Sequence, residues 1–378
     1  MRIGIDARFY GPKMGGGGLG RYVSELVTHL EQIDSSNEYV LFLRKDNFHE
    51  CRVSRPNFTK RLVDVPWYSL AEQRILPQEI IRAKVNFMHF PHWNVPVFSK
   101  TPFLVTVHDL ILLEDPMSAR ATTRNAFVHG IKYAGFRLVL ESAIHRSRHI
   151  IAVSEHTRQS VLRHFRVSPQ KISVIHNGVV KPSEGRGVSL RNLGVVEPYI
   201  LAVGNRYPHK NLEILLEAFV PVWNKHSSVS LVLAGRHDVF TERLMRLALK
   251  LGLPEHAVRF VSSPSDDELG ALYRHASLLA FPSKIEGFGI PPLEAMHVGT
   301  PVMSSNASCL PEILGDAALC TDPDDEQRMS EIMLKAIEHP DELKPYVDRG
   351  HERVTHFRWD LAAKQTLETY LKFGSRRL

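Results

Sequence analysis

The chain has 378 residues, more than one ordinary hydrophobic core accommodates, so we expect two domains. Its 43% hydrophobic and 23% charged residues are typical of a soluble globular protein, and no apolar run is long enough to span a membrane. Three scattered cysteines exclude a disulfide framework, and the first residues do not resemble a signal peptide, so we expect a cytoplasmic location. Positive charge is concentrated in the first half of the chain, which indicates that this half faces an anionic partner.

Short apolar runs alternate with helical patterns along the chain. The predicted strands comprise residues 3–5, 39–43, 87–90, 103–107, 149–153, 172–175, 199–203, 230–234, 258–261, 278–281 and 301–304. The predicted helices comprise residues 20–30, 69–81, 120–148, 158–164, 212–223, 242–250 and 266–275. This alternation predicts an α/β fold with two doubly wound parallel sheets, in Rossmann-like domains at residues 1–178 and 195–355. The polar segment at residues 179–194 is the predicted linker.

A run of glycines follows the first predicted strand and includes Gly17 and Gly18. Such a loop lets backbone N–H groups approach a diphosphate without a Cβ clash. It matches neither the dinucleotide-binding fingerprint nor the Walker A loop, so a flexible loop without a ligand is the alternative.

His108 and Asp109 follow the predicted strand at residues 103–107, at the end where open α/β sheets bind their ligands. A single histidine at a strand end is more often structural than catalytic. Its position beside an acidic residue nevertheless makes His108 a candidate for the site.

The predicted helix at residues 120–148 carries arginines and lysines among apolar side chains, including Arg124, Lys132 and Arg137. An ordinary amphipathic helix packed on the core explains this pattern. Docking on an anionic membrane surface is the alternative, and no motif supports binding of nucleic acid.

Arg206 and Lys210 lie between the predicted strand at residues 199–203 and the helix that follows. Cations at the start of a helix oppose the helix dipole unless an anion lies between them. The pair therefore predicts a phosphate site, and two solvated surface cations are the alternative.

Glu286 and Glu294 lie on either side of a Gly-Phe-Gly turn and a Pro-Pro pair. Pro291 and Pro292 suit the first turn of a helix, so we expect Glu294 in that turn and Glu286 in the loop before it. A carboxylate can accept hydrogen bonds from two neighbouring hydroxyls, so Glu294 suits a ribose diol and Glu286 a sugar hydroxyl.

Together these motifs resemble the retaining, nucleotide-sugar-dependent glycosyltransferases of the GT-B fold, in glycosyltransferase family 4. The resemblance is carried by G-G-L-G-R-Y (17–22), T-V-H-D-L (106–110), H-N-G-V (176–179), G-N-R-Y-P-H-K-N-L (204–212), the glutamate motif (283–294) and F-R-W (357–359). It implies two domains facing across a cleft, the first for the acceptor and the second for the nucleotide sugar. It also implies that residues 356–378 form a helix crossing back to the first domain.

The resemblance implies that Gly17 and Gly18 meet the donor diphosphate and that Lys210 is its cationic partner. Many family members place an arginine directly after the glycine that matches Gly204. This chain has Asn205 there and Arg206 one residue later, so the resemblance implies the phosphate role of Arg206 less directly than that of Lys210.

The glutamate motif matches the part of the family that holds the donor sugar and the ribose. Glu286 is implied to contact the transferred sugar, with the backbone N–H groups of Phe288, Gly289 and Ile290 nearby. Glu294 is implied to bind the ribose hydroxyls. His108 is implied to lie near the reacting centre and, with Asp109, near the acceptor.

The motifs look closest to mannosyltransferases of bacterial polysaccharide biosynthesis, so GDP-mannose is the expected donor, with UDP- or dTDP-sugars as alternatives. The expected acceptor is a glycan or lipid-linked glycan, which suits a peripheral position on the inner membrane face. No metal or other cofactor is expected. Transfer is expected to occur by front-face attack rather than through a covalent intermediate.

Two other classes of function are compatible with the fold. A nucleotide-sugar epimerase would turn over donor without any acceptor. A non-catalytic module would only bind nucleotide sugar, although the presence of Lys210, Glu286 and Glu294 together argues against it.

Overall fold

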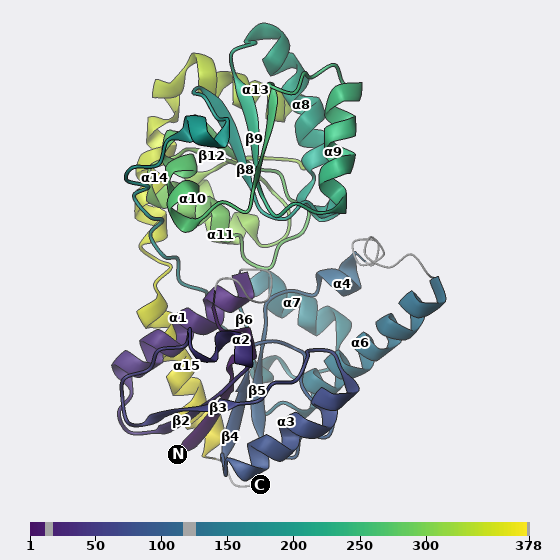
Figure 1. Ribbon diagram of the computed structural model, residues 1–378, viewed down its shortest axis with the longest axis vertical. Coiled ribbons are helices and arrows are strands. Elements are labelled where there is room, and N and C mark those ends of the chain that lie inside the picture. Colours follow the sequence, from purple (N-terminus) through teal and green to yellow (C-terminus); the bar gives the residue numbers. More distant parts are fainter. Residues whose placement is uncertain (12–17, 116–125, 376–378) are drawn as a thin grey trace. The chain divides into compact units, whose positions relative to one another are not determined.

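The computed structural model describes residues 1–11, 18–115 and 126–375. The chain forms two compact units, Met1–Gly178 with Arg358–Leu378, and Val179–Phe357 (Figure 1). Each unit is a parallel β-sheet covered by helices, which confirms the predicted α/β class. Within the described ranges, no helix is both long and apolar enough to cross a membrane.

The first unit has seven strands in the order β3-β2-β1-β4-β5-β6-β7. The strands are β1 (Arg2–Asp6), β2 (Glu38–Leu43), β3 (Phe58–Leu62), β4 (Phe87–Phe90), β5 (Phe103–Val107), β6 (His149–Ala152) and β7 (Ile172–Val174). The helices are α1 (Gly18–Ile33), α2 (Lys45–Phe48), α3 (Leu70–Arg82), α4 (Ile111–Glu114), α6 (Ala126–Arg146), α7 (Glu155–His164) and α15 (Trp359–Gly374). Strand β3 is absent from the prediction because Lys60 and Arg61 interrupt the apolar pattern of this edge strand.

The second unit has six strands in the order β10-β9-β8-β11-β12-β13. The strands are β8 (Tyr199–Val203), β9 (Ser230–Gly235), β10 (Val258–Ser262), β11 (Leu278–Phe281), β12 (Val302–Ser305) and β13 (Leu319–Thr321). The helices are α8 (Leu212–Lys225), α9 (Val239–Lys250), α10 (Asp266–His275), α11 (Ile290–His297), α12 (Leu310–Leu314), α13 (Glu326–Glu338) and α14 (Lys344–Val354).

The strand order reverses at one point in each sheet. In the first unit β1 lies between β2 and β4, and in the second β8 lies between β9 and β11. Helices that leave neighbouring strands towards opposite faces open a crevice at this point, and open α/β sheets bind their ligands there, beyond the carboxyl ends of the strands. We therefore expect ligands at the loops after β1 and β4 in the first unit, and at the loops after β8 and β11 in the second.

Residues 179–194, expected as a linker, are part of the second unit. The hydroxyl of Ser183 donates to the carboxylate of Asp267 on α10. A Cβ atom on Gly270 would lie 2.1 Å from the carbonyl oxygen of Ser183. The segment therefore packs directly on α10.

Helix α6 falls within the predicted helix at residues 120–148, of which residues 120–125 lie outside the described ranges. Its C-terminal half has the expected buried face, which includes Leu140 and Ile144. Two other apolar side chains of the helix, Ile131 and Leu138, are each 60% exposed. Packing on the core therefore explains only part of the apolar surface of the helix.

Helix α15 packs against α1 and completes the core of the first unit (Figure 1). The hydroxyl of Tyr370 lies 2.6 Å from Nδ1 of His89, whose Nε2 lies 2.8 Å from the hydroxyl of Thr106. The ring of Phe373 stacks on His149 with 4.0 Å between ring centres. Two buried histidines thus connect the last helix to the sheet.

Because these two histidines are buried in their neutral form, we expect the first unit to lose stability in acid. Burial lowers the pKa of His89 to about 3, and burial together with Lys372 and Lys171 lowers that of His149 to about 4. Below an unfolded pKa of about 6.5 the unfolded chain takes up protons that the folded chain does not. Stability is therefore lost as the pH falls from there towards the folded pKa, about 4 for His149 and about 3 for His89. Each histidine contributes at most about 1.4 kcal/mol per pH unit to this slope.

Chemical denaturation of the whole chain at several pH values measures this slope. His89→Asn should flatten it, whereas His49→Asn, at an exposed position of the same unit, should leave it unchanged. An unaltered slope in His89→Asn would contradict the assignment.

Candidate active site

The switch point of the second unit has a hollow whose lining includes Gly204, Asn205, Lys210 and Ser283. Gly204 has a φ of +139°, a conformation that a side chain would strain. A Cβ atom on Gly235 would lie 1.9 Å from the carbonyl oxygen of Gly204. The two glycines therefore allow the ends of β8 and β9 to approach closely and fix the turn that leads to α8.

Lys210 and Glu286 contact each other at this switch point. Lys210 ends the short turn before α8, and Glu286 lies between β11 and α11. Lys210 Nζ lies 2.5 Å from Glu286 Oε1, and the two side chains are only 15% and 11% exposed. The structure thus joins the cation predicted for the diphosphate to the carboxylate predicted for the sugar.

The turn after Glu286 leads directly into α11. Gly289 precedes the helix with a φ of +93°, and the helix begins at Ile290. Phe288 is buried in the same turn. The backbone N–H groups of Phe288, Gly289 and Ile290 therefore lie together at the start of α11, next to Glu286.

Glu294 is nearly buried on α11. The prediction that placed it in the first turn is wrong, because the helix begins at Ile290, ahead of the proline pair, and Glu294 falls one turn later. The phenol of Tyr273, on α10, donates to Glu294 Oε2 at 2.8 Å. The carbonyl of Tyr273 in turn accepts a hydrogen bond from the Thr300 hydroxyl at 2.5 Å. A fixed phenol thus orients the carboxylate.

Arg206 points towards the connection between β9 and α9 and is only 3% exposed. Its guanidinium donates to the carbonyl oxygen of Arg236, to that of Leu233 at 3.1 Å and to the hydroxyl of Thr241 at 2.9 Å. Burial lowers its pKa. In this conformation Arg206 holds the backbone together, so its contact with phosphate stays a prediction, and Lys210 is the cation beside Glu286.

His108 follows β5 at the carboxyl edge of the first sheet. Its Nε2 lies 2.9 Å from the carbonyl oxygen of Pro91, which can only accept, so Nε2 carries the proton and Nδ1 is an acceptor. Burial lowers the pKa of His108 to about 4 despite the opposing effect of this hydrogen bond, so the ring is neutral at pH 7. The ring of Tyr22 meets it edge-on, with 4.7 Å between centres. Nδ1 of this neutral imidazole can accept a hydrogen bond from a hydroxyl group of a ligand.

The other predicted residues of the first unit lie at strand and helix ends. Asp109, next to His108, accepts a hydrogen bond from the backbone N–H of Ile111 at 3.1 Å. Gly18 is the exposed first residue of α1, and a Cβ atom at this position would meet no other atom within 4 Å. Gly17 lies outside the described residues.

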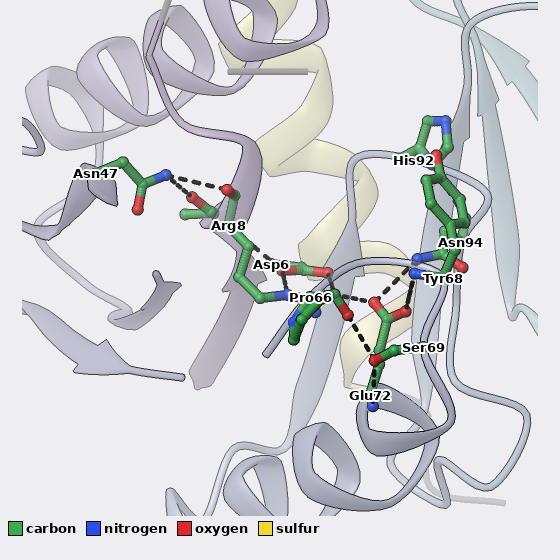
Figure 2. A network of polar contacts seen from close by, with 10 residues as sticks. Asp6, Arg8, Asn47, Pro66, Tyr68, Ser69, Glu72, His92 and Asn94 are labelled. Carbon is green, nitrogen blue, oxygen red and sulfur yellow. Dashed lines mark hydrogen bonds and ion pairs between the residues drawn. The ribbon is translucent and has the colours of Figure 1, made fainter. Parts of the chain in front are cut away.

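A buried network of charged side chains supports the same edge of the first sheet (Figure 2). Arg8, just after β1, pairs with Asp6 at 2.7 Å and with Glu72 of α3 at 2.5 Å. The amide of Asn94 donates to both oxygens of Glu72, at 2.9 and 3.0 Å. Glu72 also accepts the backbone N–H of Tyr68 at 2.8 Å. The network ties the loops after β1, β3 and β4 together.

Sequence reasoning misses Tyr273 and most of this network because the partners lie far apart in the chain. A local signal exists for Arg8, since Asp6 stands two residues before it at the end of a strand. Glu72 and Tyr273 give no such signal, because acidic residues and tyrosines are common on amphipathic helices without any special role.

Comparisons with known sequences agree with these motifs. The family model for glycosyl transferases group 1 matches residues 192–353, and that for glycosyltransferase family 4 matches residues 16–180. The O-antigen chain mannosyltransferase RfbU of Salmonella typhimurium is 30% identical over 308 residues, which are 82% of this chain and 80% of the relative.

Solved structures share the fold at low sequence identity. Sucrose-phosphate synthase from Thermosynechococcus elongatus superposes with a TM-score of 0.77 at 19% identity, covering 98% of both chains. HepE from Anabaena, solved with UDP-glucose, gives a TM-score of 0.72 at 17% identity, covering 98% of this chain and 99% of its own. This chain belongs to family 4 of the group 1 glycosyltransferases and has their GT-B fold of two Rossmann-like domains.

Proposed function

We propose that this glycosyltransferase moves a mannosyl residue from GDP-mannose to a glycan or lipid-linked glycan in polysaccharide biosynthesis. The observation that supports this proposal is the ion pair of Lys210 with Glu286 at the switch point of the second unit, followed by Glu294 on α11, which together offer one cation and two carboxylates. A sugar diphosphate with its ribose requires groups of this kind. The likeness to an O-antigen chain mannosyltransferase supports mannose as the sugar. No metal or other cofactor takes part in the proposed reaction.

In the proposed donor complex, the nucleotide sugar replaces the ion pair between Lys210 and Glu286. The diphosphate takes the ammonium of Lys210, which stabilises the negative charge of the leaving group. Glu286 then accepts hydrogen bonds from the sugar hydroxyls, and Glu294 accepts them from the ribose diol. Gly17 and Gly18 are proposed to donate backbone N–H groups to the diphosphate.

In the proposed transfer step, the acceptor hydroxyl attacks the anomeric carbon from the side that the diphosphate leaves. The bond from the acceptor oxygen forms as the bond to the phosphate oxygen breaks, through an oxocarbenium-like state, and the hydroxyl proton passes to the leaving phosphate. Neutral His108 accepts a hydrogen bond from a sugar hydroxyl at Nδ1, and Asp109 is proposed to contact the acceptor.

Replacing Glu294 tests the donor site. Glu294→Ala should weaken GDP-mannose binding by roughly 10- to 100-fold, because hydrogen bonds to a charged carboxylate are lost. Calorimetry with a panel of GDP-, UDP- and dTDP-sugars measures the loss and identifies the base and the sugar. Glu331→Ala, at an exposed position of α13, is the matched control and should bind like the wild type. Unchanged affinity in Glu294→Ala would refute the assignment.

The same sugar nucleotides, used in both binding and transfer assays, separate the rival functions. The structural likeness to HepE, solved with UDP-glucose, keeps a UDP-sugar as the alternative donor, and preferential binding of a UDP-sugar would replace GDP-mannose. Turnover of donor in the absence of any acceptor would indicate an epimerase. Binding of a nucleotide sugar without transfer to any glycan would indicate a non-catalytic module.

We also propose that helix α6 docks on the anionic inner surface of the membrane, where a lipid-linked acceptor would be presented. Ile131 and Leu138 are exposed on this helix and stand beside exposed Lys132 and Arg137. Apolar side chains flanked by cations suit the boundary of an anionic bilayer.

Charge reversal on α6 tests the docking. The double variant Lys132→Glu with Arg137→Glu should reduce binding to vesicles of phosphatidylcholine and phosphatidylglycerol at least about 30-fold, since each cation near such a surface contributes about 1 kcal/mol. Arg246→Glu with Lys250→Glu makes the same charge change on α9 and should have little effect. Equal vesicle binding by both double variants in a sedimentation assay would refute the docking.

A further inference from the structure

Aromatic rings line the carboxyl edge of the first sheet, on the loops after β1, β3 and β4. This aromatic band consists of Phe9, Trp67, Tyr68, His92 and Trp93. Ring centres are 4.4 Å apart for Phe9 and Trp67, 4.5 Å for His92 and Trp93, and 5.7 Å for Tyr68 and Trp93. His108 follows β5 at the same edge, next to β4.

Tyr68 is the most exposed member of the band, at 62%, and has a φ of +60°. A side chain other than glycine is uncommon in this conformation, and a bulky residue there stores strain that its surroundings must hold. Glu72 provides this restraint, because its carboxylate accepts the backbone N–H of Tyr68. Arg8 and Asn94 in turn fix that carboxylate (Figure 2).

A strained residue held by a buried network indicates selection for the position of its side chain rather than for stability. Figure 2 shows the ring of Tyr68 beside His92 and Asn94. Desolvation, and after it the Glu72 and Asp109 carboxylates, raises the pKa of Tyr68 to about 12. The phenol therefore keeps its proton.

We propose that the aromatic band binds a sugar ring of the acceptor and that Tyr68 is the platform against which this ring packs. A pyranose has an apolar face of C–H groups and a rim of hydroxyls, which match an exposed aromatic ring with polar groups around it. Around the band, Asp109 and Nδ1 of His108 can accept hydrogen bonds from those hydroxyls. The inference rests on the proposed function in one respect, because it takes the acceptor of the transfer reaction as the ligand.

The substitution Tyr68→Gly separates a binding role from a structural one. Glycine adopts a positive φ without strain, so this variant should unfold at a temperature no lower than the wild type. It also removes the ring, so it should weaken saccharide binding on the order of tenfold. Tyr68→Phe keeps the ring and should retain most of the affinity. Phe98→Gly removes another exposed ring of the same unit, outside the band, and should bind like the wild type.

Binding is measured on the full chain without donor, by saturation-transfer NMR with α-linked mannobioses and with gluco- and galacto-configured disaccharides. Transfer assays then compare the KM values for acceptor and donor, and Tyr68→Gly should raise only the acceptor KM. An acceptor KM within twofold of wild type, or no saccharide binding by the wild type, would overturn the inference. Loss of stability in Tyr68→Gly without loss of binding would overturn it as well. If the wild type binds saccharides through Tyr68 but transfers no sugar, the inference stands and the proposed function fails.

Discussion

The contact between Lys210 and Glu286 is the interaction around which the second unit organises its candidate site. It joins the loop after β8 to the loop after β11, at the point where the sheet reverses its strand order. Both side chains are largely buried, so separating them without a replacement partner would leave an unpaired charge at a high cost in free energy. A ligand must therefore offer an anion to the lysine and hydrogen-bond donors to the glutamate at the same time. A phosphate alone or a sugar alone satisfies only half of this requirement, which favours a molecule that carries both.

The two units place charge differently on the same topology. In the second unit Lys210 lines a hollow and pairs with the partly exposed Glu286, so a ligand that enters the hollow can replace this ion pair. At the corresponding edge of the first unit, Asp6, Arg8 and Glu72 form a buried set of charges. Removing one member of a buried set leaves an uncompensated charge, so such a set resists rearrangement. The first unit therefore has a rigid edge that positions aromatic rings and His108. The second unit has an edge at which a ligand can replace an ion pair.

Patterns local in the chain were enough to predict most strands and to select Lys210 and Glu286, which the structure brings into contact in the candidate site of the second unit. Glu286 and Glu294 are recognisable because glycines and prolines fix the backbone between them, and Lys210 because it opens a helix where a cation is unfavourable. Arg206 shows where such reasoning stops, since its position at a strand end gives no information on the direction of its side chain. The roles of Tyr273 and Glu72 could not be predicted from local patterns, because their contacts form only when distant segments of the chain meet.

The last helix of the chain has a consequence for how the protein is made. Trp359, Ala363 and Tyr370 of α15 are part of the core of the first unit, which otherwise consists of residues 1–178. The ribosome synthesises the whole second unit before it reaches them, which takes roughly 10 to 40 seconds at ordinary elongation rates. During that interval the first unit has an uncovered apolar surface where α15 will pack. The unit whose synthesis begins first is thus completed only after the second unit, and its apolar surface stays open to aggregation until α15 emerges.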